Sequence, residues 1–289
     1  MSKEKVFFRC SDSIIGFKDK IAKTLKLKER DRIRNVRDPV LFFGMYHSSD
    51  WFSFIRHKGK RYVLWAGGDL INLKRNYAFS DGNNYWGVLS KLFRWFDWSI
   101  IFRIFEAQHF VENEMEQDEL LEMGIESTIV PTFLEDVKDF PVSFRPSKNP
   151  ELFISARPGR EDKYGVDLVR RISPLVPFAK FHIYGVDGKS EKNIQFHGLV
   201  PPKQFNQEIR KYHSGLRPNE HDGNSEIAMK SVLMGQYPIT RIEYPHIWSY
   251  QGESRLINLI KELRNQKEPN LKARRYWQKS VNKFPFLDK

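Results

Sequence analysis

The feature that most constrains the fold is an alternation of short apolar runs with helical patterns along most of the 289-residue chain. Continuous apolar runs, such as residues 39–44 and 61–66, are typical of strands that are buried on both faces of a parallel sheet. Between such runs, apolar side chains recur at helical spacing, as over residues 165–173. Strands that alternate with helices in this way predict α/β layers built on parallel sheets.

The alternation falls into two blocks, separated by residues 138–149, which contain prolines and show little periodicity. Such a stretch is typical of a linker. We predict a first domain at 1–145, a second at 146–265, and a last helical segment at 266–289 that is a candidate to pack back on the first domain. The predicted strands are 5–10, 39–44, 61–66, 107–111, 125–130, 151–155, 179–184, 193–197, 214–216 and 237–240, and the predicted helices are 13–27, 114–123, 165–173, 202–212, 226–234, 253–265 and 271–283.

The charge balance restricts the classes of partner. The chain has 48 Lys and Arg against 36 Asp and Glu, a formal net charge of +12. Such an excess suits nucleic acid, an anionic membrane surface or a phosphorylated substrate. Basic residues are densest at 18–37 and 267–283. Because the chain has no zinc-finger spacing, RNP-like motif or homeodomain-like pattern, we expect no specific nucleic-acid partner.

The single cysteine and the lack of long apolar runs predict a cytoplasmic protein. Cys10 is the only cysteine, so the chain has no internal disulfide and no cysteine-based metal site. We find no apolar signal-peptide core and no run of the roughly 20 apolar residues that a membrane span needs. Residues 86–110 favour either peripheral membrane contact or an ordinary core helix. The side chains that favour membrane contact are Trp86, Lys91, Phe93, Arg94, Trp95, Phe96 and Trp98.

Two polar stretches follow predicted strands, where ligands bind in open α/β sheets. Residues 156–165 carry Arg157, Arg160 and Lys163 before a helix, a pattern that predicts a diphosphate site, with a solvated basic loop as the alternative. In residues 216–226, Asn224 or Ser225 is suited to cap the next helix, and Gly223 lets the backbone approach a ligand closely. The density of polar residues beside a buried strand indicates a binding site.

Together these stretches resemble the donor domain of the GT-B glycosyltransferases, most closely the retaining group known as family 4. The resemblance covers residues 151–240 and rests on short motifs in the family's order. They are Ser155-Ala156-Arg157 with Lys163-Tyr164-Gly165, Tyr184-Gly185, Asn193-Ile194-Gln195-Phe196-His197-Gly198, Arg217-Pro218 before Asp222-Gly223-Asn224-Ser225, and Gly235-Gln236-Tyr237-Pro238-Ile239. The implied fold class is α/β, with two Rossmann-like domains whose parallel sheets face an interdomain cleft.

The resemblance implies roles for single residues. Arg157 and Lys163 neutralise the donor diphosphate, and Arg160 is a rival because this loop is one residue longer than the common pattern. Asp222 takes the place of the first glutamate of the family's E-x7-E motif, near the transferred sugar, and is a catalytic candidate. The remaining residues of the implied donor site are Gly185, His197, Arg217, Gly223, Asn224, Ser225 and Lys230.

Lys230 departs from the family pattern, which has a glutamate there that holds the nucleotide ribose. Three interpretations stay open. Lys230 contacts a phosphate; or Glu226, one turn earlier, pairs with Lys230 or partly replaces the missing carboxylate; or Lys230 points to solvent and the donor site is degraded.

The first half resembles the acceptor-side domain of these enzymes more loosely. Gly44, Tyr46, His47 and Asp50 follow one predicted strand. Asp69 ends a turn, Trp65-Ala66-Gly67-Gly68-Asp69, that looks like the W-x-G-x-D turn of some members. Because relatives place a polar residue of this region near the reacting sugar, Asp69 is the first catalytic candidate of this half and His47 the second. Glu112 and Asn113 are weaker ones.

The predicted function is transfer of a hexose from a nucleotide sugar, such as a UDP- or GDP-sugar, to a glycan, lipid or other acceptor. The resemblance implies retention of anomeric configuration and no metal or other cofactor. A catalytically inactive GT-B protein that binds a sugar nucleotide or a glycan is the alternative. A sugar-nucleotide epimerase and a basic nucleic-acid binder are the remaining hypotheses.

Overall fold

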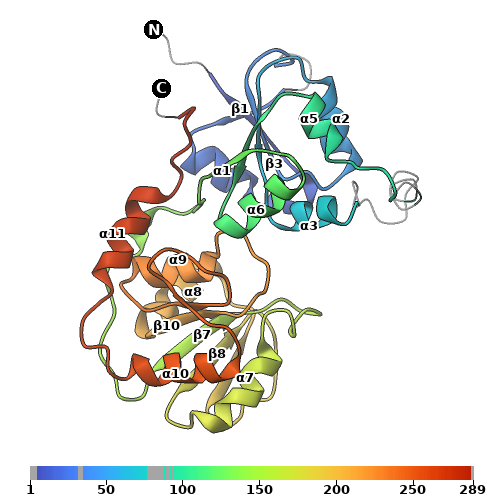
Figure 1. The fold of residues 1–289 in the computed structure, drawn as a ribbon. Coiled ribbons are helices and arrows are strands. Elements are labelled where there is room, and N and C mark those ends of the chain that lie inside the picture. The colour runs from blue at the N-terminus through green and yellow to red at the C-terminus, as the bar shows by residue number, and fades with distance from the viewer. Residues whose placement is uncertain (1–4, 32–34, 77–87, 89–91, 93, 288–289) are drawn as a thin grey trace. The chain divides into compact units, whose positions relative to one another are not determined.

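The structure is a computed structural model that describes residues 5–31, 35–76, 88, 92 and 94–287. The chain divides into two compact units, one of Met1–Glu135 with Val281–Lys289 and one of Asp136–Ser280. Each unit is built on its own six-stranded sheet (Figure 1). All paired strands are parallel, which confirms the two-block α/β fold expected from the sequence.

The sheet of the first unit has the strand order β2-β1-β3-β4-β5-β6. Its strands are β1 (Phe7–Cys10), β2 (Lys28–Glu29), β3 (Val40–Phe43), β4 (Arg61–Leu64), β5 (Gln108–Val111) and β6 (Ser127–Ile129). The strand order reverses at β1, because β2 lies on one side of it and β3 on the other. Ligands of open sheets bind beside such a reversal, here at the carboxyl ends of β1 and β3.

Helices cover both faces of this sheet. The helices are α1 (Lys18–Thr24), which follows the 3-10 turn η1 (Asp12–Phe17), α2 (Ser48–Arg56), α3 (Gly68–Lys74), α5 (Ile100–Ile104) and α6 (Glu114–Glu122). On one face, α2, α3, α5 and α6 bury a core that includes Trp51, Trp65 and Phe102. On the other face, Ile21 of α1 and Phe284 pack on the sheet. Burial of each such large side chain contributes about 2–3 kcal/mol.

The sheet of the second unit has the order β12-β11-β10-β7-β8-β9. Its strands are β7 (Glu151–Ser155), β8 (Lys180–Tyr184), β9 (Ile194–Gly198), β10 (Ser214–Arg217), β11 (Ile239–Thr240) and β12 (Trp248–Ser249). The chain builds outward from β7 in one direction and then from β10 in the other, which is the strand order of a Rossmann fold. The reversal lies between β7 and β10, so their carboxyl ends mark the expected ligand site.

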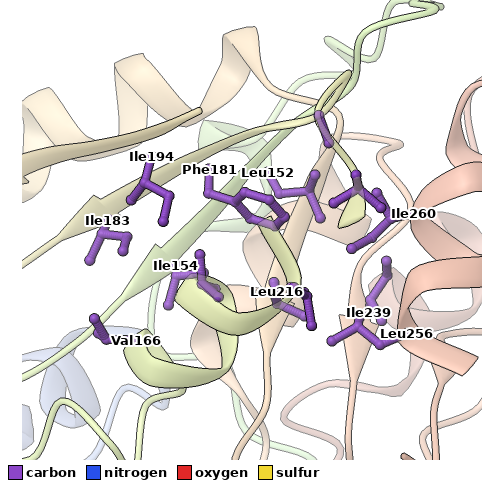
Figure 2. Close-up of a cluster of buried hydrophobic side chains, with 14 of the residues drawn as sticks. Leu152, Ile154, Val166, Phe181, Ile183, Ile194, Leu216, Ile239, Leu256 and Ile260 are labelled. Carbon is purple, nitrogen blue, oxygen red and sulfur yellow. The ribbon is translucent and has the colours of Figure 1, made fainter. Parts of the chain in front are cut away.

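The helices of the second unit also lie on both faces of its sheet (Figure 1). They are α7 (Val166–Ile172), α8 (Pro202–Glu208), α9 (Glu226–Leu233), α10 (Glu253–Leu263) and α11 (Leu271–Ser280), with short 3-10 turns η2 (Val137–Asp139), η3 (Ser173–Leu175) and η4 (Ile209–Lys211). Figure 2 shows the core under α7 and α10, where Ile154 and Phe181 of the sheet meet Val166 and Ile260 of these helices. On the opposite face, Phe153 packs edge-on against Phe205 of α8.

The unit boundary lies ten residues before the one expected at 145/146. Phe140 and Phe144 are buried, and the Ser143 N–H donates to the Met234 carbonyl at 3.0 Å, so the proline-containing stretch belongs to the second unit. At the other end, α11 packs on α9 within the second unit. Only the residues after α11 join the first unit, where the Asn282 amide donates to the Phe133 carbonyl at 2.7 Å.

The aromatic segment after α3 is described only in part, because Trp86, Lys91 and Phe93 lie outside the described residues. Within it, Trp95 is 77% exposed, whereas Trp98 packs edge-on against the buried Trp51 with ring centroids 6.1 Å apart. Its aromatic side chains are thus divided between surface and core. In the described part of the chain, no helix is both long enough and apolar enough to cross a membrane.

Candidate functional site

The loops that follow β7 and β10 meet at the strand reversal of the second unit. The Arg217 guanidinium lies over the Tyr164 ring, 4.8 Å from its centroid. Gly165 lies so close to Pro218 that a Cβ on the glycine would sit 2.1 Å from Pro218 Cγ. The structure therefore brings together the two stretches that the sequence singled out.

The loop after β7 presents three exposed basic side chains, those of Arg157, Arg160 and Lys163. The backbone beneath them is fixed by turn hydrogen bonds. The Arg160 N–H donates to the Arg157 carbonyl at 3.1 Å, and the Gly159 N–H donates to the Glu161 carboxylate at 3.0 Å. Within the described parts of the chain, none of the three cations forms an ion pair. A fixed turn with three available cations is suited to a diphosphate.

The loop after β10 is organised by an ion pair. Arg217 Nε donates to Asp222 Oδ2 at 2.6 Å, and both side chains are mostly buried. Burial acts to lower the pKa of Arg217, but the attraction and hydrogen bond of Asp222 outweigh it and raise that pKa above its ordinary value. Arg217 therefore stays charged, and it holds the Asp222 carboxylate in one orientation.

The end of this loop leads into α9. Ser225 Oγ accepts a hydrogen bond from the Ala228 N–H at 3.3 Å, which confirms Ser225 as the cap of the helix. The Tyr244 hydroxyl donates to the Gly223 carbonyl, which ties this backbone to the β11–β12 connection. Asn224 precedes the cap and is half-buried. Sequence reasoning missed Asn219, whose side-chain oxygen is buried and has no hydrogen-bond partner among the described residues.

Lys230 does not point to solvent, so the solvent-exposed orientation is wrong, whereas its pairing with Glu226 is confirmed. The residue is 3% exposed, and its Nζ lies 2.7 Å from Glu226 Oε1. The rings of Phe205 and Phe140 flank the ammonium, with centroids 5.2 and 5.9 Å away. Side chains of a helix lean toward its N-terminus, so this ion pair lies beside the first turn of α9, where the loop after β10 ends.

Gly185 follows β8 and lies against the start of the loop after β7, whereas His197 lies on β9. Gly185 has φ +86°, and a Cβ there would lie 2.2 Å from the Ala156 carbonyl oxygen. His197 Nε2 lies 2.9 Å from His182 Nδ1, and its ring stacks on Tyr184 with centroids 4.4 Å apart. His182 Nε2 in turn forms a hydrogen bond with Glu151 Oε2 at 2.7 Å. His197 thus belongs to a polar network on the sheet, a placement that its sequence motif did not indicate.

In the first unit, Asp50 organises the carboxyl ends of β1 and β3. Its carboxylate is 1% exposed and forms an ion pair with Arg9 at 2.7 Å. It also accepts hydrogen bonds from the Ser11 hydroxyl at 2.5 Å and from the His47 N–H at 2.9 Å. Sequence reasoning found Asp50 but missed Arg9, which lies on β1, and Ser11, which directly follows β1. A polar residue at the end of the apolar run 5–10 was the available signal.

Asp69 is fully enclosed. Its carboxylate accepts N–H hydrogen bonds from Met45 at 2.8 Å, and from Ala66 and Leu70 at 2.9 Å each. Burial raises its pKa to about 6, against the opposing effect of these bonds. Asp69 is 1% exposed and joins the turn after β3 to the turn after β4. This geometry favours a positioning role over the direct catalytic role suggested by the sequence.

Gly44, Tyr46 and His47 lie around these turns, whereas Glu112 and Asn113 follow β5. The Tyr46 hydroxyl donates to the Ala66 carbonyl at 3.1 Å, and Gly44 has φ +78°. His47 is the N-cap residue of α2 and is partly exposed, with its Nε2 2.8 Å from the hydroxyl of Ser13. Asn113 caps α6 by accepting from the Glu116 N–H at 3.0 Å, and Glu112 accepts from the Thr132 hydroxyl. In the part of the chain that the structure describes, no group of His, Cys, Asp or Glu is arranged to hold a metal ion.

Comparison with known proteins finds similarity in structure alone. No protein-family model matches the chain, and no curated protein sequence matches it. Among solved structures, the lipopolysaccharide outer core galactosyltransferase WaaB in its apo form has a TM-score of 0.62 at 11% identity, over 98% of this chain and 97% of that one. Anabaena Alr3699/HepE in complex with UDP and glucose has a TM-score of 0.53 at 11% identity, over 96% and 95%.

A third similar structure is the pneumococcal O-GlcNAc transferase GtfA in complex with UDP and GlcNAc. It has a TM-score of 0.55 at 14% identity, over 86% of this chain. The chain spans about half the length of GtfA and of TarM, 55% and 52% respectively. At such identities a structural likeness establishes the fold. The chain has the GT-B fold of these glycosyltransferases, with two Rossmann-like units.

Proposed function

We propose that the chain is a glycosyltransferase that binds a nucleoside diphosphate sugar at the loops after β7 and β10. The observation that carries the proposal is the meeting of these loops at the strand reversal. One loop presents Arg157, Arg160 and Lys163, and the other presents the Arg217–Asp222 pair. The UDP in the complexes of GtfA and HepE supports a nucleotide donor.

The chemistry of the proposed site follows from its charges. Negative charge grows on the leaving diphosphate as the bond to the sugar breaks. Fixed cations at that place stabilise the transition state, and removal of one such group typically costs about 3–4 kcal/mol. Arg157 and Lys163 are the proposed partners of the diphosphate, with Arg160 beside them. The Asp222 carboxylate, held by Arg217, is suited to accept hydrogen bonds from hydroxyls of the transferred sugar.

We further propose transfer of a hexose with retention of configuration, to a glycan, lipid or other acceptor. Basic side chains, in this proposal, take the place of a metal ion. The acceptor-side candidates are the residues at the reversal of the first unit's sheet. His47, which is partly exposed beside Ser13, is the strongest of them, because Asp50 and Asp69 are buried by backbone and side-chain donors.

The test is nucleotide release from a panel of UDP-, GDP- and other nucleotide sugars, with and without candidate acceptors. We expect Arg157→Ala and Lys163→Ala each to lower kcat/KM by about a hundredfold or more. Lys180→Ala is the matched control, because Lys180 is an exposed cation at the amino end of β8, on the opposite edge of the same sheet. Unchanged turnover in both loop variants would overturn the assignment.

A second candidate function is a GT-B protein that binds a sugar nucleotide or a glycan without turning it over. The observation that favours it is Lys230, which stands where the family has a ribose-binding glutamate and is already paired with Glu226. This candidate predicts that a nucleotide raises the unfolding temperature while no nucleotide sugar in the panel is consumed. Loss of that stabilisation in Arg157→Ala would place the binding at the same loop.

A further inference from the structure

We propose that the exposed face of α11 docks the protein on the surface of an anionic lipid bilayer. The opposite side of this helix is firmly held. Ala273 and Trp277 are buried, and Trp277 Nε1 donates to the Pro245 carbonyl at 3.0 Å. Arg274 Nη1 donates to the Phe140 carbonyl at 2.7 Å. The helix is therefore fixed to the second unit, and its outer face keeps one orientation.

The outer face of α11 is a basic stripe, which we define as Lys272, Arg275, Tyr276 and Lys279. These residues stand at positions i, i+3, i+4 and i+7 and so share one side of the helix. All four are exposed. Tyr276 is 38% exposed, and its ring packs edge-on against His246 with centroids 5.1 Å apart, which holds it at the surface.

The charges of the basic stripe have no compensation within the described residues. The sequence of α11, LKARRYWQKS, contains no acidic residue. Like charges three and four residues apart on a helix repel, and a cation in the first turn, such as Lys272, also opposes the helix dipole. Lys272, Arg275 and Lys279 form no ion pair in the described parts of the chain.

Three exposed cations on other helices are each paired with an acidic side chain. Lys74 pairs with Glu119 at 3.1 Å, Arg171 pairs with Glu253 at 2.9 Å, and Arg255 pairs with Glu262 at 2.9 Å. The basic stripe differs from these three pairs, because its cations have no acidic partner among the described residues. An anionic partner would remove the repulsion along α11.

Two exposed side chains beside the cations, Leu271 and Tyr276, favour a bilayer over other polyanions. Leu271 begins the helix and is 38% exposed, as is Tyr276. Lys272 and Lys279 are about 10 Å apart along the axis. Tyr276 lies between them, and Leu271 directly precedes Lys272. Long basic side chains with an adjacent tyrosine suit the interface between headgroups and acyl chains.

The experiment is co-sedimentation of the full chain with vesicles of phosphatidylcholine alone, or of phosphatidylcholine with phosphatidylglycerol, at physiological ionic strength. We expect binding only to the anionic vesicles. The triple variant Lys272→Glu/Arg275→Glu/Lys279→Glu should weaken binding at least about tenfold. The matched control is Lys23→Glu/Lys26→Glu/Lys28→Glu, which changes net charge equally at three exposed lysines of the first unit. It should weaken binding much less.

Two further variants separate loss of the basic charges from the introduction of acidic ones, and from the contribution of Tyr276. Lys272→Gln/Arg275→Gln/Lys279→Gln removes the charges without introducing acids, and should weaken binding in the same direction. Tyr276→Ser should weaken binding without a change in net charge. Equal losses of vesicle binding in the α11 triple variant and in the control triple variant would show an effect of net charge alone and overturn the proposal. Tighter binding to RNA or DNA than to anionic vesicles, lost in the α11 triple, would overturn it in favour of a nucleic-acid face.

Failure of this proposal is distinguishable from failure of the proposed function. The basic stripe lies on α11, whereas the proposed donor site is formed by the loops after β7 and β10. Nucleotide binding of the α11 triple variant should therefore equal that of the wild type, and its far-UV circular dichroism should be unchanged. Vesicle binding should persist in Arg157→Ala.

Discussion

Gly165 determines how closely the two loops of the candidate site approach each other. Gly159 and Gly165 have similar positive φ values, +74° and +79°, but only Gly165 faces Pro218. Gly165→Ala should lower the free energy of unfolding of the second unit by about 2 kcal/mol or more, from backbone strain and from displacement of the Pro218 ring. Urea unfolding measures the loss. Nucleotide affinity should fall with it, because the loops separate.

Gly159→Ala is the control, because a Cβ at Gly159 meets no atom within 4 Å. It shares the backbone strain and should cost about 1 kcal/mol. The difference between the two variants isolates the close approach of the loops. Equal losses would show that the Gly165–Pro218 contact contributes nothing.

At this scale the sequence identified residues better than it identified their roles. Asp69 was chosen because its turn resembles the W-x-G-x-D turn of some family members, but a sequence does not show that three backbone N–H groups converge on its carboxylate. Arg217 and Asp222 were both chosen, yet their pairing depends on how the loop folds back. The role expected of exposed residues such as Arg157 and Lys163 needs only charge and position, and it stays a prediction.

At the scale of elements, α9 carries the strongest departure from the family pattern. Lys230 is buried beside Phe140 and Phe205 and pairs with Glu226. Lys230→Glu restores the family residue, but we expect it to lower the free energy of unfolding by about 2–4 kcal/mol, because two carboxylates then share one partly buried site. Thermal or urea unfolding, monitored by tryptophan fluorescence, measures the change.

The charge-swapped double variant Glu226→Lys/Lys230→Glu is the matched control for this prediction. It should recover at least half of the loss, because the ion pair forms again with its polarity reversed. A single variant as stable as the wild type, or improved nucleotide affinity in Lys230→Glu, would contradict the prediction and favour a ribose-binding role for this position.

The strands were largely predictable, and β7 spans the same residues as predicted. Continuous apolar runs specify strands because a parallel sheet is covered on both faces. The two-residue strands β2 and β12 were missed because they carry too few residues to form a pattern. The helices α2 and α3 were also missed, since both begin within the polar turns that drew attention as candidate site residues.

The position of His197 depends on an irregularity that an apolar pattern does not reveal. The pairing of β8 with β9 shifts between Ile183 and Tyr184, so that Tyr184 pairs with Gly198. Such a bulge redirects the neighbouring side chains. His197 accordingly lies against His182 and Tyr184 instead of extending past the strand end.

At the scale of the whole molecule, two separate hydrophobic cores share one chain. The core under α7 and α10 draws only on the second unit, and the first unit buries Phe284 from the far end of the sequence. Each unit can therefore unfold as its own cooperative step, and a single two-state transition is not expected. The stability of each unit should be followed by a probe in that unit.

Buried histidines should make both units sensitive to acid. Burial lowers the pKa of His57 and His109 in the first unit, and of His182 in the second, to about 4 each from 6.5. Below pH 6.5 the unfolded chain binds protons that the folded chain does not, so stability is full above pH 6.5 and is lost as pH falls toward 4. At pH 5, each of these histidines lowers the free energy of unfolding by about 2 kcal/mol relative to its value at neutral pH.

Asp69 makes stability depend on pH in the opposite direction to the histidines. Its pKa is raised to about 6, so its contribution to stability is present at low pH and is lost as pH rises through 6. With two histidines against one aspartate in the first unit, we still expect the urea midpoint of both units to fall between about pH 7.5 and pH 5. His57→Gln should flatten the dependence in the first unit and leave that of the second unchanged. Midpoints that stay constant over this range would show that these histidines are protonated in the folded protein.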